Sequence, residues 1–142
     1  MIHNITYRTF VYGTEDEEKV IDAISYLFSN PLPEKTITED HFGNDIVILS
    51  DKITKKRLNR DFIEFLNENL SSDDKEIIKN ELSRRMDEKG NLFLRFDNQE
   101  ALDENLKLTY SGDAIHVRIK IASYPVSKDN AIEVAHKIFN FL

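Results

Sequence analysis

Cysteine is absent from this chain of 142 residues. A chain without cysteine forms no disulfide, offers no thiolate to a metal ion and has no thiol nucleophile. Long apolar runs are absent too, since none approaches the roughly 20 residues that span a bilayer. The opening residues also lack the basic region and apolar core of a signal peptide. We therefore expect a cytoplasmic protein that has no membrane among its partners.

Motifs for catalysis and metal binding are missing as well. The 4 histidines show neither the HxxxH nor the HExxH spacing of helical metal sites, and no glycine-rich loop of the phosphate-cradling type occurs. One carboxylate cluster is more typical of a solvated turn than of a magnesium-dependent nuclease; it comprises Asp97, Glu100, Asp103 and Glu104. We expect no catalytic residues, no bound metal and no cofactor, so the sequence does not predict an enzyme.

The net charge of −7 opposes indiscriminate binding of nucleic acid. Charges are screened, however, over a Debye length of about 8–10 Å at physiological salt. Acidic side chains on the far side of a helix layer would lie roughly 20 Å from the opposite face of a sheet. Local charge therefore decides what such a face binds, provided that acidic and basic residues segregate.

Alternating and helical periodicities predict an α+β fold. Residues 2–12 and 114–124 alternate as half-buried strands, and further strands are expected at 35–40, 46–49, 91–96 and 106–110. Apolar stripes predict helices whose N-caps are Thr14, a residue in the 71–74 run, and Ser127, with a further helix over 58–70. A turn at Ser111-Gly112-Asp113 would join strand 106–110 to strand 114–124 in a hairpin. We expect a single domain over residues 1–142, with a mainly antiparallel sheet and helices mostly on one face.

The polar side of the expected strands is cationic. Its charged positions are Arg8, Arg95, His116, Arg118 and Lys120, beside the aromatic residues Phe10, Tyr12, Phe93 and Tyr124. Sheets that bind RNA use aromatic rings to stack bases and cations to hold the backbone. The alternative is a solvated face whose long side chains cover apolar neighbours, or a face that a helix covers.

A second basic cluster precedes and begins the helix over 58–70. Its members are Lys52, Lys55, Lys56, Arg57 and Arg60. Cations at a helix N-terminus oppose the helix dipole, whereas a phosphate there would meet both the side chains and backbone N–H groups. The alternative is an ordinary charged helix face on which Arg60 pairs with Glu64.

Four segments, taken in order, resemble the archaeal predicted exosome-subunit family of RNA-binding proteins. They are the opening strand followed by TEDEEKV, the turn HFGN before IVIL, the run NLFLRFDNQ, and GDAI before VRIK. The resemblance covers nearly the whole chain. It implies a fold like that of ribosomal protein L-five and a role in RNA binding, and it brings no catalytic residues. The chain departs from the family at Phe42, where a histidine is expected, and at Asn98, where a lysine is expected.

The sequence therefore predicts a non-enzymatic RNA-binding accessory protein beside an RNA-processing or exosome-type complex. We expect phosphate contacts from Arg8, Arg95, Arg118 and Lys120, stacking surfaces from Tyr12 and Tyr124, and an extension of the site by Lys55, Lys56 and Arg57. This requires that the three arginines share one open face. The alternative is a protein-interaction adaptor or homodimer module that does not bind RNA directly, with Phe10 and Phe93 as interface anchors.

Overall fold

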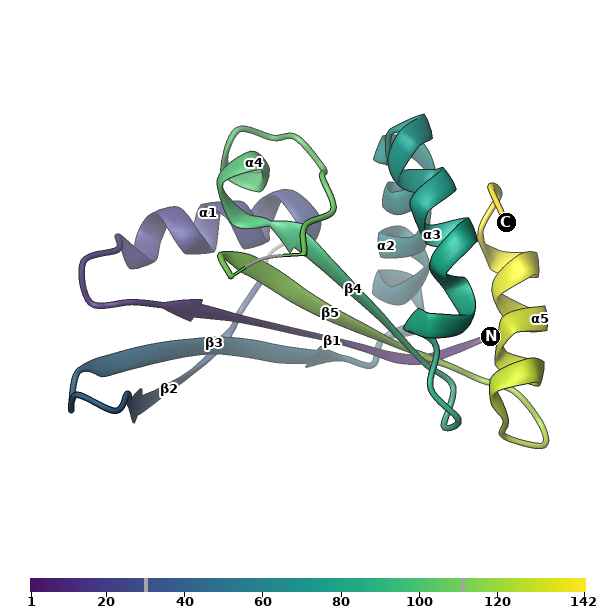
Figure 1. The fold of residues 1–142 in the computed structure, drawn as a ribbon, viewed down its shortest axis with the longest axis horizontal. Helices are drawn as coiled ribbons and strands as arrows, with labels where there is room; N and C mark the ends of the chain where they lie inside the picture. Colours follow the sequence, from purple (N-terminus) through teal and green to yellow (C-terminus); the bar gives the residue numbers. More distant parts are fainter. Residues whose placement is uncertain (30, 111) are drawn as a thin grey trace.

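In the computed structural model, which describes residues 1–29, 31–110 and 112–142, strands form one antiparallel sheet in the order β2-β3-β1-β5-β4 (Figure 1). The strands are β1 (Ile2–Val11), β2 (Glu34–Glu39), β3 (Asp45–Ile53), β4 (Asn91–Asp97) and β5 (Ala114–Ile121). The helices are α1 (Glu17–Leu27), α2 (Lys56–Asn69), α3 (Ser72–Arg85), α4 (Asn98–Leu102) and α5 (Lys128–Ile138). The predicted α+β architecture is confirmed, while the likeness to ribosomal protein L-five stays a prediction.

The helices lie on one side of the sheet and around one end of it (Figure 1). β1 turns Ile5, Tyr7 and Val11 into the core between the sheet and the helices. Tyr7 stacks on Phe28 with ring centroids 4.6 Å apart, and Phe28 stacks on Phe62 of α2 at 4.5 Å. Replacing a buried aromatic such as Phe62 with alanine costs about 3–5 kcal/mol. The aromatic column therefore fixes α2 against the sheet.

Side-chain hydrogen bonds cap the N-termini of four helices, α1, α3, α4 and α5. Ser71 accepts a hydrogen bond from the backbone N–H of Asp74, and Ser127 caps α5 in the same way, both at 3.1 Å. These two caps agree with the sequence-based predictions. The predicted Thr14 cap is wrong, because α1 begins at Glu17 and its N-cap is Asp16.

None of the helices in the described ranges is long and apolar enough to cross a membrane.

The predicted hairpin between residues 106–110 and 114–124 is wrong. β5 lies between β1 and β4, whereas Leu108 forms an isolated bridge to Phe96 on the outer edge of β4. Hydrogen bonds from Asp97 N–H to the Lys107 carbonyl and from Thr109 N–H to the Arg95 carbonyl, at 2.8 and 3.0 Å, hold the segment there. The alternation of residues 106–110 is compatible with pairing to β5 or to β4. Packing between residues far apart in the chain therefore determines which strand the segment pairs with. Ser111 of the predicted turn lies outside the described residues.

Candidate nucleic-acid interface

The face of the sheet opposite the core gathers cations from three strands. Arg8 on β1 lies directly opposite His116 on β5, which in turn lies opposite Arg95 on β4. In the next row, Arg118 on β5 lies between Thr6 and Phe93. Residues directly opposite each other in antiparallel strands point to the same face. The structure therefore places Arg8, Arg95 and Arg118 on one face.

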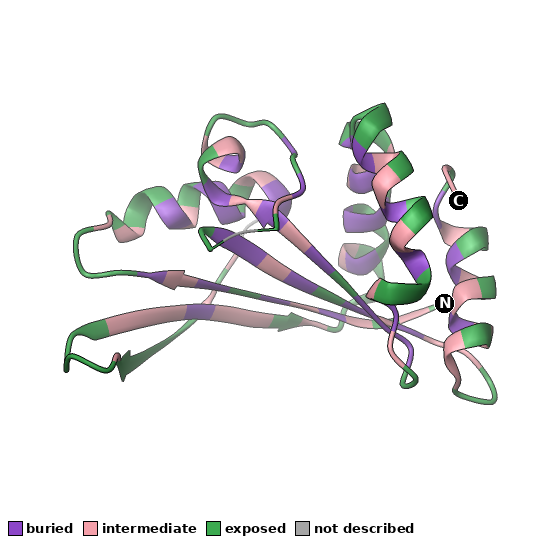
Figure 2. Cartoon of the chain, viewed as in Figure 1, coloured by how far each residue is buried: buried purple, intermediate pink, exposed green. Residues whose placement is uncertain are grey.

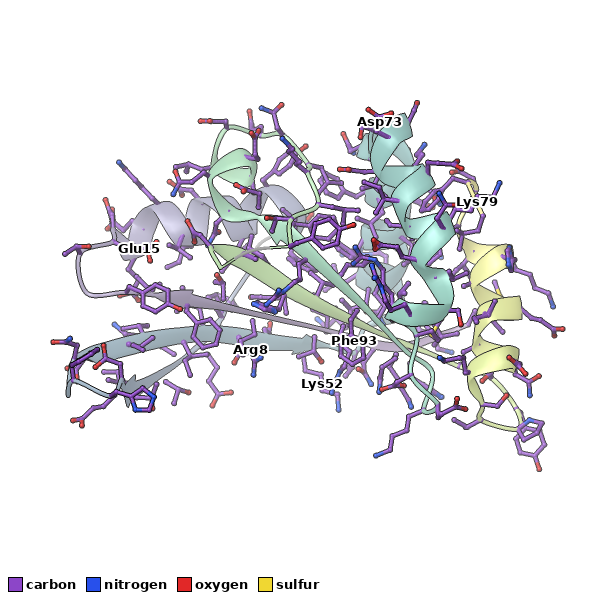
Figure 3. The ribbon with its side chains drawn as sticks, viewed as in Figure 1. Arg8, Glu15, Lys52, Asp73, Lys79 and Phe93 are labelled. Atoms are coloured by element: carbon purple, nitrogen blue, oxygen red, sulfur yellow. The ribbon has the colours of Figure 1, made fainter. Side chains whose placement is uncertain are left out.

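A shallow groove of about 490 Å³ runs over this face. We call it the cationic groove, and its side-chain lining comes from Thr6, Arg8, Ser50, Phe93, Arg95, His116 and Arg118. Arg8 and Arg118 are exposed, and 46% of Phe93 is exposed. Arg8, Lys52 and Phe93 lie on the side of the sheet away from α1 and α4 (Figure 3). The groove is consequently open to a ligand from solution.

His116 lies at the centre of the groove. The Arg95 Nε–H donates to its Nδ1 at 3.4 Å, and Arg95 also donates from Nη1 to the Tyr110 carbonyl at 3.3 Å. Burial, followed by the positive charges of Arg95 and Arg8, lowers the pKa of His116 below its ordinary value. The imidazole is therefore a neutral acceptor between two guanidinium groups. An anion placed here would reduce the repulsion between those cations.

The other two arginines are positioned by neutral neighbours. The Arg8 guanidinium carbon lies 5.4 Å from the centroid of the Phe10 ring, a cation–π contact. Arg118 donates from Nη2 to Thr6 Oγ1 at 3.3 Å. None of the ion pairs formed between described residues involves Arg8, Arg95 or Arg118. Their charges are thus available to an anionic ligand.

The remaining predicted sheet residues are placed less centrally. Lys120 lies on the same face one row beyond Arg118, opposite Asn4 and Asn91, and donates from Nζ to the Lys89 carbonyl in the loop between α3 and β4. Tyr12 follows β1, and its ring stacks 6.4 Å from that of Phe10, extending the aromatic surface beyond the groove. Tyr124 is 96% exposed, but it lies beyond the end of β5 at Ile121. Of these three residues, Tyr12 and Lys120 continue the face, whereas Tyr124 lies beyond the strand.

The basic cluster at the start of α2 adjoins the groove through Lys52. Lys52 on β3 lies opposite Thr6, which lies opposite Arg118, so a cationic side chain extends that row. The chain then reaches the exposed residues Lys55, Lys56 and Arg57; Lys55 is the N-cap of α2 and makes no side-chain cap hydrogen bond. Basic residues therefore continue from the sheet to the first turn of this helix.

Sequence reasoning left His116, Phe93 and Lys52 out of the predicted site. The alternation of β4 and β5 already placed His116 and Phe93 on the polar side of their strands. It did not show that these strands are neighbours, nor that Lys52 lies in the same row as Arg118. The sequence did not indicate the order of the strands in the sheet, and this order is what brings these residues together.

The two departures from the resembling family fall outside the groove. Asn98 is 4% exposed, and its Nδ2 donates to Thr9 Oγ1 at 3.1 Å and to Asp113 Oδ1 at 3.0 Å. It therefore ties α4 to the sheet. Phe42 lies in the turn between β2 and β3 and is 88% exposed. Neither side chain reaches toward the three arginines.

In the carboxylate cluster at 97–104, the Asp97 side chain has a local structural role. Asp97 is the N-cap of α4 and accepts a hydrogen bond from the Glu100 N–H at 2.9 Å. Within residues 1–29, 31–110 and 112–142, no group of three or more histidine, aspartate or glutamate side chains is placed to hold a metal ion. The interface is accordingly described by its cations and aromatic rings.

Comparison with known proteins identifies the family of this chain. A family model described as RNA binding matches residues 4–121. The chain is 35% identical over 141 residues to RNA-binding protein PAB1135 of Pyrococcus abyssi, a match that covers 95% of this chain and 92% of that protein.

Two solved structures share the fold along nearly their whole length. Mth689, a DUF54 protein from Methanothermobacter thermautotrophicus, is 40% identical, with a TM-score of 0.83 over 99% of each chain. AF2318 from Archaeglobus fulgidus is 32% identical, with a TM-score of 0.87 over 97% of this chain and 99% of that one. The family match spans most of the sequence, and the chain therefore belongs to this RNA-binding family.

Proposed function

We propose that the protein binds RNA in the cationic groove. The observation that carries the proposal is the group of three arginines, none in an ion pair among the described residues, around the neutral His116. Arg8, Arg95 and Arg118 contact phosphates, and Phe93 offers its exposed ring to a base. Membership of an RNA-binding family supports the same ligand.

A single-stranded segment suits the groove better than a duplex. Specific RNA recognition favours unstacked bases that stack on aromatic side chains, and a shallow sheet face with exposed rings offers such a surface. Each stacked base contributes about 1–3 kcal/mol. Contacts from the three arginines to about three phosphates give a slope of log affinity against log salt near −2 for a single strand. The salt dependence therefore reports directly on the arginines.

We also propose that the RNA-binding surface continues past the groove onto the start of α2, and that the protein has an accessory role in the cell. Lys55, Lys56 and Arg57 hold the strand where it leaves the sheet, because Lys52 links them to the row of Arg118. The protein acts as an accessory without catalysis, beside an RNA-processing or exosome-type complex in the cytoplasm. This part of the proposal is supported by the family resemblance of the sequence.

The proposal is tested by titrating a fluorescent single-stranded RNA of about 16 nucleotides at several salt concentrations. In the Arg95→Ala/Arg118→Ala variant we expect at least tenfold weaker binding and a salt slope shallower by about 1.4, that is, about 0.7 for each lost phosphate contact. A Lys79→Ala/Lys137→Ala variant removes the same charge from exposed positions of α3 and α5 and serves as the control. Equal affinity and slope in the arginine variant and the control would exclude the groove.

Association with other proteins needs its own test. The tagged protein is recovered from cells with and without ribonuclease treatment. Co-recovery of exonuclease subunits that depends on intact RNA supports the RNA-binding role. Co-recovery that survives the nuclease favours the adaptor alternative, in which the exposed ring of Phe93 and the neighbouring Arg118 contact an acidic protein.

A further inference from the structure

The strand β2 forms an open edge of the sheet. All of its residues, Glu34–Glu39, are exposed, and Figure 2 shows the strand green along its length. Among the strands of the described residues, β2 pairs with β3 alone and ends the strand order. The opposite edge strand, β4, is partly covered, because Met86 and Leu108 form isolated bridges to it. An edge without such cover is a template for pairing with another strand.

The residues of β2 are complementary to those of a second β2 running antiparallel. We consider the register in which Ile37 lies opposite Ile37 of the other copy. Lys35 then lies opposite Glu39 at both ends, and Thr36 lies opposite Thr38. Opposite charges, β-branched apolar pairs and threonine pairs are the favourable cross-strand combinations in antiparallel sheets. At each end of this register Glu34 meets Asp40, a like-charge pair that opposes the pairing; Asp40 lies beyond β2, and its carboxylate accepts hydrogen bonds from the N–H groups of Phe42 and Asn44.

Neighbouring registers lack this complementarity. Opposite residues of the two copies must point to the same face of the combined sheet, so the neighbouring registers are centred on Thr36 and on Thr38. The register centred on Thr36 places Lys35 opposite Ile37 and leaves Glu39 without a cation. The register centred on Thr38 places Ile37 opposite Glu39 and leaves Lys35 opposite His41. The charge pattern therefore selects the register centred on Ile37.

We propose that two copies of this chain form a symmetric dimer by pairing their β2 strands in this register. The two sheets become one continuous sheet around a two-fold axis perpendicular to it. Ile37, which is 61% exposed in the single chain, then packs against its copy and against Val47, its neighbour on β3. Both cationic grooves lie on the same face of the combined sheet. The dimer does not depend on RNA binding.

An existing contact orients the charged end of the interface. Lys35 donates from Nζ to Glu17 Oε2 of α1 at 3.1 Å, which holds it on the helix-covered side of the sheet. Glu39 of the second copy arrives on that same side, so Lys35 lies between two carboxylates. A pairing limited to one short strand buries less than the roughly 1,600 Å² of a standard interface. The dimer is therefore reversible and depends on concentration.

The test is sedimentation analysis of the purified protein without RNA, over a wide range of concentrations. The wild type is expected to shift from monomer to dimer as its concentration rises. Ile37→Lys, Lys35→Glu and Glu39→Lys each place like charges opposite each other, and each is expected to weaken the dimer at least tenfold. The Lys35→Glu/Glu39→Lys combination restores the opposite-charge pairs and is expected to recover most of the affinity.

The controls separate the interface from unrelated effects of charge. Lys79→Glu makes the same charge change on α3, and we expect the affinity of the dimer to stay within twofold of the wild type. Lys35→Glu loses its Glu17 contact in both the single and the combined variant, so recovery isolates the pairing between copies. Circular dichroism verifies that each variant is folded. A wild type that remains monomeric, or a combined variant as weak as the single variants, overturns the proposal.

Discussion

Arg95 on β4 donates from Nε to Nδ1 of His116 on β5 across a distance of 3.4 Å, in the middle of the cationic groove. The contact requires an imidazole that is neutral at Nδ1. Burial and the charges of Arg95 and Arg8 favour the same neutral form by lowering the pKa of His116. A bound phosphate would oppose the electrostatic part of this shift, so this pair couples anion binding to protonation.

We predict that affinity for RNA rises as the pH falls from about 8 toward 6. The bound phosphate raises the pKa of His116 from its depressed value in the free protein, so the complex takes up a proton that the free protein does not hold. Arg8, Arg95 and Arg118 stay charged throughout. Titrations at fixed salt measure the effect, and His116→Asn, which keeps an acceptor but does not titrate, is expected to flatten the profile. Parallel profiles for the two proteins would contradict this coupling.

Phe93→Ala is expected to weaken RNA binding by about tenfold, because loss of one stacked base costs about 1–3 kcal/mol. Tyr124→Ala removes another exposed ring, but that ring lies beyond the end of β5, and we expect little change. Titration of the fluorescent single-stranded RNA measures the affinity of both variants. A larger loss from Tyr124→Ala than from Phe93→Ala would place the bases outside the groove.

Asn98→Ala is expected to lower the free energy of unfolding by about 1–3 kcal/mol. Asn98 donates to the fully buried Thr9 and to the exposed Asp113, so the substitution removes a donor from one buried acceptor, Thr9 Oγ1. The neighbouring exposed Gln99 also contacts Asp113, at 3.3 Å, and Gln99→Ala is expected to change stability by less than about 0.5 kcal/mol. Urea unfolding measures both. Equal effects of the two substitutions would show that the Thr9 contact contributes nothing.

Tyr7→Phe is expected to leave stability unchanged or to raise it by about 1 kcal/mol. The Tyr7 hydroxyl is buried and has no hydrogen-bond partner among the described residues, so its removal relieves an unsatisfied polar group. Burial and then the charge of Asp51 raise the pKa of Tyr7, which agrees with a poorly solvated hydroxyl. The stacking on Phe28 is kept. Thermal unfolding tests this, and a loss above about 1 kcal/mol would mean that the hydroxyl is satisfied.

Gly90→Ala is expected to destabilise the protein more than Gly43→Ala does. Both residues have positive φ angles, 82° and 76°, a conformation that costs a residue with a Cβ about 1–2 kcal/mol. A Cβ at Gly90 would also lie 3.1 Å from the Ile121 carbonyl oxygen, whereas one at Gly43 would meet no atom within 4 Å. Urea unfolding compares the two variants, and equal losses would show that the chain relaxes freely around residue 90.

Strands and helix caps could be predicted from the sequence because they depend on residues that are close together in the chain. The alternation of residues 2–11 and 114–121 corresponds to β1 and β5, because side chains of a strand point to opposite faces in turn. The cap in the 71–74 run, which is Ser71, and the cap at Ser127 could be predicted because a serine hydroxyl at this position accepts a hydrogen bond from a backbone N–H two or three residues later. Asp16 rather than Thr14 caps α1, since both residues fit a cap and the sequence pattern did not separate them.

The sequence by itself determined that the polar side of the strands is cationic and aromatic. The tertiary structure decided that Arg8, Arg95 and Arg118 share an open groove around His116, and that Lys52 joins them. It also moved residues 106–110 to the outer edge of β4 and left Tyr124 outside the sheet. These outcomes depend on strand order and register, which are set by packing between residues far apart in the chain. Alternation reports only which face of a strand a side chain occupies.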